Sequence, residues 1–129
     1  MPRNKELKVK NKNLNVKFPD DDYRELQQIA DEIGGMTLSS MIRMLIYTQL
    51  NKVRETGEPR NFVIISNQNI EKVKERVLNV KLPENDYKEI QMIANGIGIT
   101  VSLMVRMLIY SQLDKVRKLN DSKSFLNTK

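Results

Sequence analysis

Hydrophobic and polar residues alternate strictly over residues 13–18, with apolar side chains at Leu14, Val16 and Phe18. The same alternation returns over residues 77–82. A period of two residues is typical of a β-strand that buries one of its faces. Each stretch ends in a proline, which ends a strand and suits the first turn of a helix. We therefore predict two short strands, each followed at once by a helix.

After each proline the apolar residues recur every three or four positions, which is the helical period. Residues 20–34 and 84–98 begin with acidic side chains and end in glycine. Acidic groups favour the positive end of a helix, and glycine is a common helix stop. A second helical pattern follows Thr37 and Thr100, which are suited to cap it. Each half of the chain thus predicts a strand, a helix, a short turn and a second helix.

The two halves are copies of one another. Residues 8–34 align with 72–98, residues 36–54 align with 99–117, and 29 of the 46 aligned positions are identical. A lone strand in one copy has unpaired edges, and a copy of about 45 residues buries too little surface to be stable. We therefore predict that the two strands pair antiparallel about a pseudo-twofold axis, with four helices over their apolar face.

The predicted fold class is mostly α with one short antiparallel β-ribbon, built from two repeats that form one intramolecular domain. The chain then divides into a basic arm, a first repeat, a linker with a basic lead-in, a second repeat and a disordered tail (1–12, 13–54, 55–76, 77–117 and 118–129). In the linker, the apolar run 62–65 predicts an extra strand or a cover for an exposed patch, and 69–75 could form a short helix. Pairing between two molecules is the alternative, but the linker is long enough to turn back.

The amino-acid composition lacks most of the side chains that enzymes commonly use for catalysis. The 129 residues include no Cys and no His, which excludes thiol nucleophiles, thiolate metal sites and the commonest general base. We find no nucleophile–base pair and no metal-ligand cluster, and we expect no enzyme, no cofactor, no metal and no small-molecule ligand. No apolar run approaches the ~20 residues of a membrane span, and no signal core follows Met1. A cytoplasmic protein without membrane contact is the expectation.

The charge balance points to a polyanionic partner. Lys and Arg number 22 against 16 Asp and Glu, which gives a formal charge of +6. The excess lies before each predicted strand and in the tail, whereas the two repeats are close to neutral. Such an excess suggests a polyanion without identifying it.

The chain resembles the ribbon-helix-helix family of DNA-binding proteins, of the Arc, MetJ and CopG type. The resemblance rests on the alternating strand that ends in proline, on the helix that ends in glycine, and on the start of the second helix. There, residues 35–43 (GMTLSSMIR) and 98–106 (GITVSLMVR) both match the family pattern G-x-[ST]-x-S-x-x-[IV]-R. The family normally builds its fold from two chains, whereas both copies lie in one chain here. The resemblance implies a double-stranded DNA partner.

Site residues follow from the exposed strand face and from the helix ends. Asn, Lys and Val can contact base edges in the major groove, so the base-reading candidates are Asn13, Asn15, Lys17, Val77, Asn79 and Lys81. Helix N-termini and basic residues suit phosphates, so the phosphate candidates are Thr37, Ser39, Thr100, Ser102, Lys8, Lys10, Lys12, Lys72, Lys74 and Arg76. Arg43 and Arg106 are interpreted as structural and paired with a helix carboxylate.

The leading hypothesis is a sequence-specific transcriptional regulator, a repressor that inserts a β-ribbon into the major groove and can self-associate on DNA. A plasmid mobilisation or partition accessory protein is the alternative with the same partner. A protein-interaction module such as an antitoxin is the alternative of another class. Because Asn13 and Val77 occupy matching positions, we expect a binding site with imperfect twofold symmetry.

Overall fold

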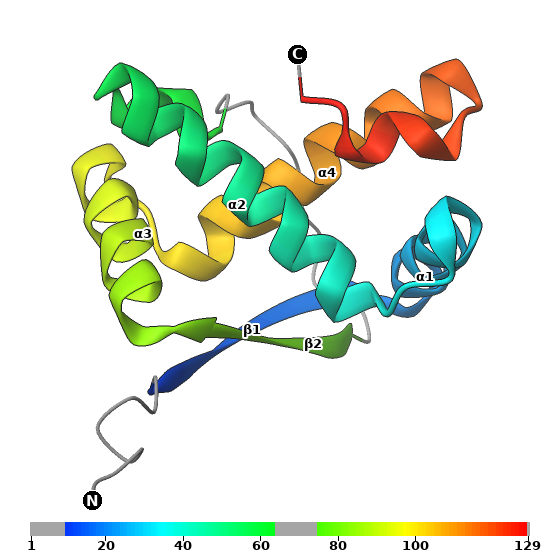
Figure 1. Ribbon diagram of the computed structural model, residues 1–129. Coiled ribbons are helices and arrows are strands. Elements are labelled where there is room, and N and C mark those ends of the chain that lie inside the picture. Colours follow the sequence, from blue (N-terminus) through cyan, green and yellow to red (C-terminus); the bar gives the residue numbers. More distant parts are fainter. Residues whose placement is uncertain (1–9, 64–74, 129) are drawn as a thin grey trace, which may run out of the picture.

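The computed structural model describes residues 10–63 and 75–128 (Figure 1). It is mostly helical, with one two-stranded antiparallel sheet. The elements in chain order are β1 (Asn11–Pro19), α1 (Asp20–Gly34), α2 (Leu38–Thr56), the 3-10 turn η2 (Pro59–Phe62), β2 (Glu75–Pro83), α3 (Glu84–Ile97), α4 (Val101–Leu119) and the 3-10 turn η3 (Ser122–Leu126). The predicted order of strand, helix, turn and helix is confirmed in both halves.

The strands β1 and β2 come from the two halves and pair with each other inside one chain. Their register places Asn15 opposite Asn79 at the centre of the ribbon. In Figure 1 the ribbon crosses one side of the molecule, and the helices lie on the other side. The alternating apolar residues face those helices and are buried, as the period of two predicts: Leu14, Val16, Phe18, Leu78, Val80 and Leu82.

The helix boundaries follow local chemistry. Each first helix begins directly after the proline that ends its strand. The left-handed residue that ends it is Gly98 (φ 94°) in α3 but Gly35 (φ 67°) in α1, one position after the predicted Gly34. Glycine adopts this conformation without a Cβ penalty. The predicted caps Thr37 and Thr100 are confirmed, because each hydroxyl oxygen accepts a backbone N–H of the following turn at 3.1 Å.

The second helix of each half packs on the strand of the other half. Ser39 of α2 contacts β2, and Ser102 of α4 contacts β1. The helices also cross between halves, because Tyr47 of α2 donates to Asp86 of α3, and Tyr110 of α4 donates to Asp22 of α1. Neither half therefore completes its own core, and the two share one cluster of buried residues.

The tail is ordered up to residue 128, so the prediction of disorder for 118–129 is wrong for that part. Phe125 is fully buried, and its carbonyl accepts a hydrogen bond from Gln112 Nε2 at 2.8 Å. The same arrangement follows α2, where Gln49 Nε2 donates to the carbonyl of buried Phe62 at 2.7 Å. The tail folds because burying its phenylalanine outweighs the entropy lost by ordering a short polar segment.

The linker also covers the core. Phe62 and Val63 are buried, so the described part of the apolar run 62–65 acts as a cover and forms no strand. The rest of that run and most of the predicted short helix over 69–75 lie outside the described residues. The last residue of that predicted helix, Glu75, instead begins β2.

Phe125→Ala tests whether the tail belongs to the core. The change leaves a cavity where a fully buried ring packs against the helices, so we expect the free energy of unfolding to fall by about 3–5 kcal/mol. Urea denaturation followed by circular dichroism measures it. Lys123→Ala, an exposed change in the same turn, should stay within about 0.5 kcal/mol of the unmodified chain. Equal stability of the two variants would contradict the packed tail.

Candidate nucleic-acid interface

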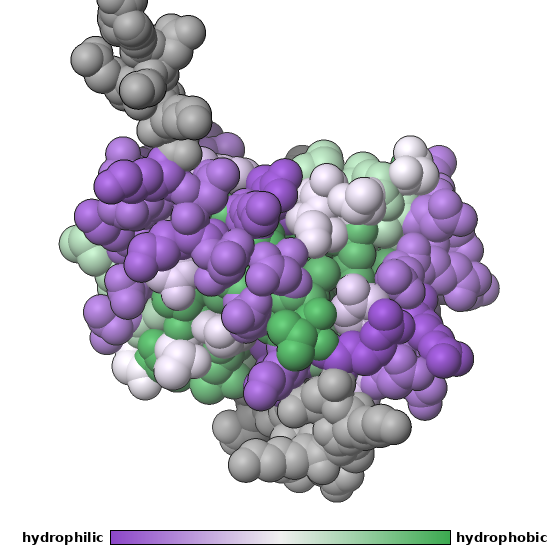
Figure 2. Space-filling model, turned by 90° about the horizontal axis from the view of Figure 1, so that it is seen from below, coloured by the Kyte–Doolittle hydropathy of each residue, from purple (hydrophilic) through white to green (hydrophobic). Residues whose placement is uncertain are grey.

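The outer face of the ribbon is polar and open. All six base-reading candidates are exposed there, while the alternate residues face the core. Figure 2 views the molecule from the ribbon side, and hydrophilic side chains cover most of this face. Val77 is the apolar member of the set and is 52% exposed. The structure thus brings these six side chains onto one surface, which we call the ribbon face: Asn13, Asn15, Lys17, Val77, Asn79 and Lys81.

The ribbon face is ordered by its register into three cross-strand pairs. Asn13 lies opposite Lys81, Asn15 opposite Asn79, and Lys17 opposite Val77. Asn79 Nδ2 donates to Asn15 Oδ1 at 2.9 Å, so the two central amides are joined across the ribbon. An amide has two N–H donors and an acceptor oxygen, so hydrogen-bonding capacity on both side chains is left for a ligand.

Two helix N-termini lie beside the centre of the ribbon. Ser39, in the first turn of α2, donates from Oγ to the carbonyl oxygen of Asn79 at 2.8 Å. Ser102, in the first turn of α4, donates from Oγ to the carbonyl oxygen of Asn15 at 2.9 Å. The first N–H groups of a helix have no intrahelical partner, and the helix dipole makes this end attractive to anions. The structure therefore places one anion-attracting end beside each strand.

The capping hydroxyls are already engaged within their helices. Thr37 Oγ1 accepts the Ser40 N–H and donates to Ser40 Oγ at 2.9 Å, and Thr100 Oγ1 accepts the Leu103 N–H. The Ser39 and Ser102 hydroxyls donate to strand carbonyls. The hydroxyls of Thr37, Ser39 and Ser102 thus already donate their single proton, and phosphate contact by all four side chains stays a prediction.

The predicted basic phosphate contacts are described in part. Lys10, Lys12 and Arg76 are exposed at the start of their strands. Lys12 Nζ lies 6.0 Å from the Tyr87 ring centre, and the Arg76 guanidinium lies 4.1 Å from that of Tyr23, so the first helix of the opposite half holds each side chain. Arg76 also lies 3.5 Å from an Asp20 carboxylate oxygen. Lys8, Lys72 and Lys74 lie outside the described residues.

Arg43 makes a structural contact, but with a partner that the sequence did not predict. Its Nε donates to the carbonyl oxygen of Lys81 at 3.1 Å, whereas we expected a helix carboxylate as the partner. The family pattern singled out this arginine, but a motif does not identify a backbone partner on a strand 38 residues away. The hydrogen bond of the central amide pair was also not predicted, because the strand register that joins the two side chains is set by tertiary packing.

Two polar clusters neutralise the carboxylates at the start of α1 and α3. Arg54 contacts Asp86 at 3.0 Å and Glu89 at 2.8 Å, and Arg117 contacts Asp22 at 3.0 Å and Glu25 at 2.7 Å. Hydrogen bonds and charge from these carboxylates raise the pKa of both arginines, so both stay charged. These clusters link the two halves. Their arginines also neutralise acidic charge that would otherwise repel a polyanion.

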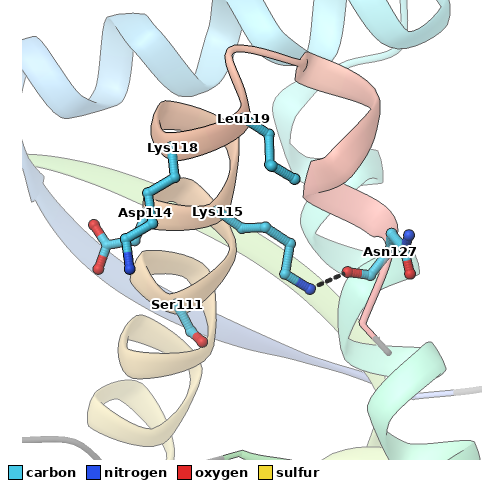
Figure 3. Close-up of a pocket in the computed structure, with 6 residues that line it drawn as sticks. All are labelled: Ser111, Asp114, Lys115, Lys118, Leu119 and Asn127. Carbon is cyan, nitrogen blue, oxygen red and sulfur yellow. Dashed lines mark hydrogen bonds between the residues drawn. The ribbon is translucent and has the colours of Figure 1, made fainter.

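Other kinds of site are not evident in the described part of the chain. It holds no group of three residues suited to bind a metal, and no single helix that is long and apolar enough to cross a membrane. Helices α3 and α4 pass that test only as a pair, and the pair is bent by 86°. A hollow lies at the C-terminal end of α4, where Lys115 Nζ donates to the Asn127 carbonyl oxygen at 2.7 Å (Figure 3). Ser102 marks the ribbon end of α4, and about 14 Å of helix separates it from Ser111, the nearest residue of α4 that lines this hollow.

A scan against protein-family models, a search of curated proteins and a search of solved structures each found no match.

Tyr47→Phe tests the link between α2 and α3. Burial, with the hydrogen bond to Asp86, raises the pKa of Tyr47 to about 12. Loss of the hydroxyl should lower the free energy of unfolding by about 1 kcal/mol at pH 7. Because the folded-state pKa is raised, this contribution is complete below pH 10 and is lost as the pH rises through about 12.

Urea denaturation at a series of pH values measures this difference between the unmodified chain and the variant. Tyr87→Phe leaves the Asp86 contact intact and is the matched control. A difference between Tyr47→Phe and the unmodified chain that persists unchanged up to pH 12 would contradict the assignment.

Proposed function

We propose that this chain is a cytoplasmic transcriptional regulator that binds double-stranded DNA sequence-specifically. It acts as a repressor and places the ribbon formed by β1 and β2 in the major groove. In this proposal its two repeats form one pseudo-twofold ribbon-helix-helix domain. The observation that carries the proposal is the exposed polar ribbon face with a helix N-terminus beside each strand.

The dimensions of the ribbon suit the major groove. Paired strands lie ~4.8 Å apart, and the major groove of B-DNA is roughly 12 Å wide, which admits a two-stranded ribbon. The two helix N-termini then approach the phosphates of the strands that border the groove. Lys10, Lys12 and Arg76 add positive charge where the ribbon strands begin.

The side chains of the ribbon face have the chemistry of base recognition. Asn can bond adenine through two hydrogen bonds, Lys can bond guanine O6 and N7, and Val can contact a thymine methyl group. Two of the three pairs of matching positions are identical between the repeats, Asn15 with Asn79 and Lys17 with Lys81, but Asn13 matches Val77. The two DNA half-sites should then be equal except at the base pair that Asn13 contacts in one half-site and Val77 contacts in the other.

Pairing of the strands inside one chain supports a regulator that needs no second copy to complete its ribbon. Joining two modules in one chain gives them an effective concentration of order millimolar, so ribbon formation does not depend on protein concentration. A mobilisation or partition accessory protein would use the same interface, and the genomic positions of bound sites separate the two roles.

The protein-interaction alternative has less support. Antitoxins of the resembled family typically use an extended tail to hold a toxin. Here the residues after α4 fold back on the chain through η3, and Phe125 is buried. No extended apolar segment follows the second repeat within the described residues.

Selection from random duplex DNA at physiological salt tests the proposal. We expect a consensus site, and an affinity that falls steeply as salt is raised because phosphate contacts release counterions. Asn15→Ala with Asn79→Ala should lower the affinity for that site by 10-fold or more, since each lost base contact costs ~1–3 kcal/mol, while binding to unrelated DNA is retained. Selection that yields no consensus would refute the sequence-specific function.

Val77→Asn tests the origin of asymmetry in the site. The change makes the ribbon face identical in both repeats, so selection should move from an imperfect to a perfect palindrome at one base pair. That base pair should be worth about 1–3 kcal/mol. Asn13→Val is the matched control, because it should produce the opposite palindrome. An unchanged preferred sequence in both variants would contradict base contact at this position.

A further inference from the structure

The two serines of the helix starts touch the backbone of the central base-reading residues. Ser39 Oγ lies 2.8 Å from the carbonyl oxygen of Asn79, and Ser102 Oγ lies 2.9 Å from that of Asn15. Each contact joins residues of different repeats, 40 and 87 positions apart in the chain. The same bond therefore occurs twice, once on each edge of the ribbon.

The geometry of an antiparallel pair explains why these carbonyls are open to the helices. Residues opposite one another alternate between pairs that exchange backbone hydrogen bonds and pairs whose backbone groups point outward. In outward-pointing pairs the side chains are closest, and Asn15 and Asn79 are joined through their side chains. Lys81, the next residue on the ribbon face of β2, likewise has its carbonyl bonded by Arg43.

We propose that Ser39 and Ser102 are positioning residues for DNA recognition, which fix the main chain of Asn79 and Asn15 to the helix ends that hold phosphate. This inference rests on the proposed function. A phosphate bound at the start of α2 then sets the position of Asn79 in the other repeat, and α4 does the same for Asn15. In this inference the two serine hydroxyls act through the ribbon, in place of the phosphate contact predicted for them from the sequence, because each donates its only proton to a carbonyl.

A purely stabilising role of the two serines predicts that their replacement lowers stability and leaves selective DNA binding intact, which differs from the result that we expect. Both bonds are exposed to solvent, so water can satisfy the carbonyls when serine is replaced. Ser39→Ala and Ser102→Ala should therefore each lower the melting temperature by about 3 °C or less. In contrast, the ratio of the affinities for cognate and unrelated DNA should fall strongly, because the central asparagines lose their fixed position.

The experiment measures binding of the full chain to its selected duplex and to an unrelated duplex at several salt concentrations. We expect each alanine variant to lose about tenfold in affinity for the selected site, with unchanged affinity for the unrelated duplex and an unchanged salt slope. Ser39→Thr and Ser102→Thr keep the hydroxyl and should restore selective binding. Equal losses on both duplexes would instead indicate phosphate contact and would overturn the inference, as would full selectivity in the alanine variants.

A second readout needs no DNA. The carbonyl carbon resonance of Asn79 should move in Ser39→Ala and that of Asn15 in Ser102→Ala, each more than the resonance of the other asparagine. Unmoved resonances would overturn the serine contacts themselves. If the unmodified chain selects no consensus, the proposed function fails and the DNA part of this inference fails with it, while the carbonyl readout still decides the structural part.

Discussion

The pairing of β1 with β2 is the constraint on which the rest of the structure depends. Each strand lies alone in its own repeat, and a strand without a partner leaves backbone groups unpaired along both edges. Pairing within the chain satisfies the inner edges, and the helix starts of α2 and α4 contact the outer ones through Ser39 and Ser102. The second helix of each half thereby lies on the strand of the other half, and one shared core results.

The register of this ribbon links stability to the candidate interface. The inner face is filled by fully apolar side chains, so a shift of one residue would bury Asn15 and Lys17 and expose Val16 and Phe18. Burial thus fixes which residues point outward, although those residues contribute little to the core. The central pair of asparagines is the visible result, because their side chains can bond only in this register.

The polar clusters and the two 3-10 turns hold the helices over that ribbon. Tyr47 with Arg54 ties α2 to the start of α3, and Tyr110 with Arg117 ties α4 to the start of α1. Phe62 and Phe125 are buried after the second helix of each half, and a glutamine from the same helix bonds each carbonyl. The tyrosine and arginine contacts lie at the starts of α1 and α3, and the two phenylalanines follow the C-terminal ends of α2 and α4. None of these contacts uses a residue of the ribbon face.

The sequence by itself determined the elements, because strand period, proline, glycine and threonine caps act over a few residues and both copies repeat them. It also determined the six outward residues, since a buried apolar face forces the alternate positions outward. Only the tertiary structure decided the partners of Ser39, Ser102 and Arg43, which are strand carbonyls far away in the chain. It likewise decided the fate of the tail, whose polar composition predicts disorder although Phe125 is buried in the shared core. Long-range contacts depend on the closed ribbon, and no local pattern records them.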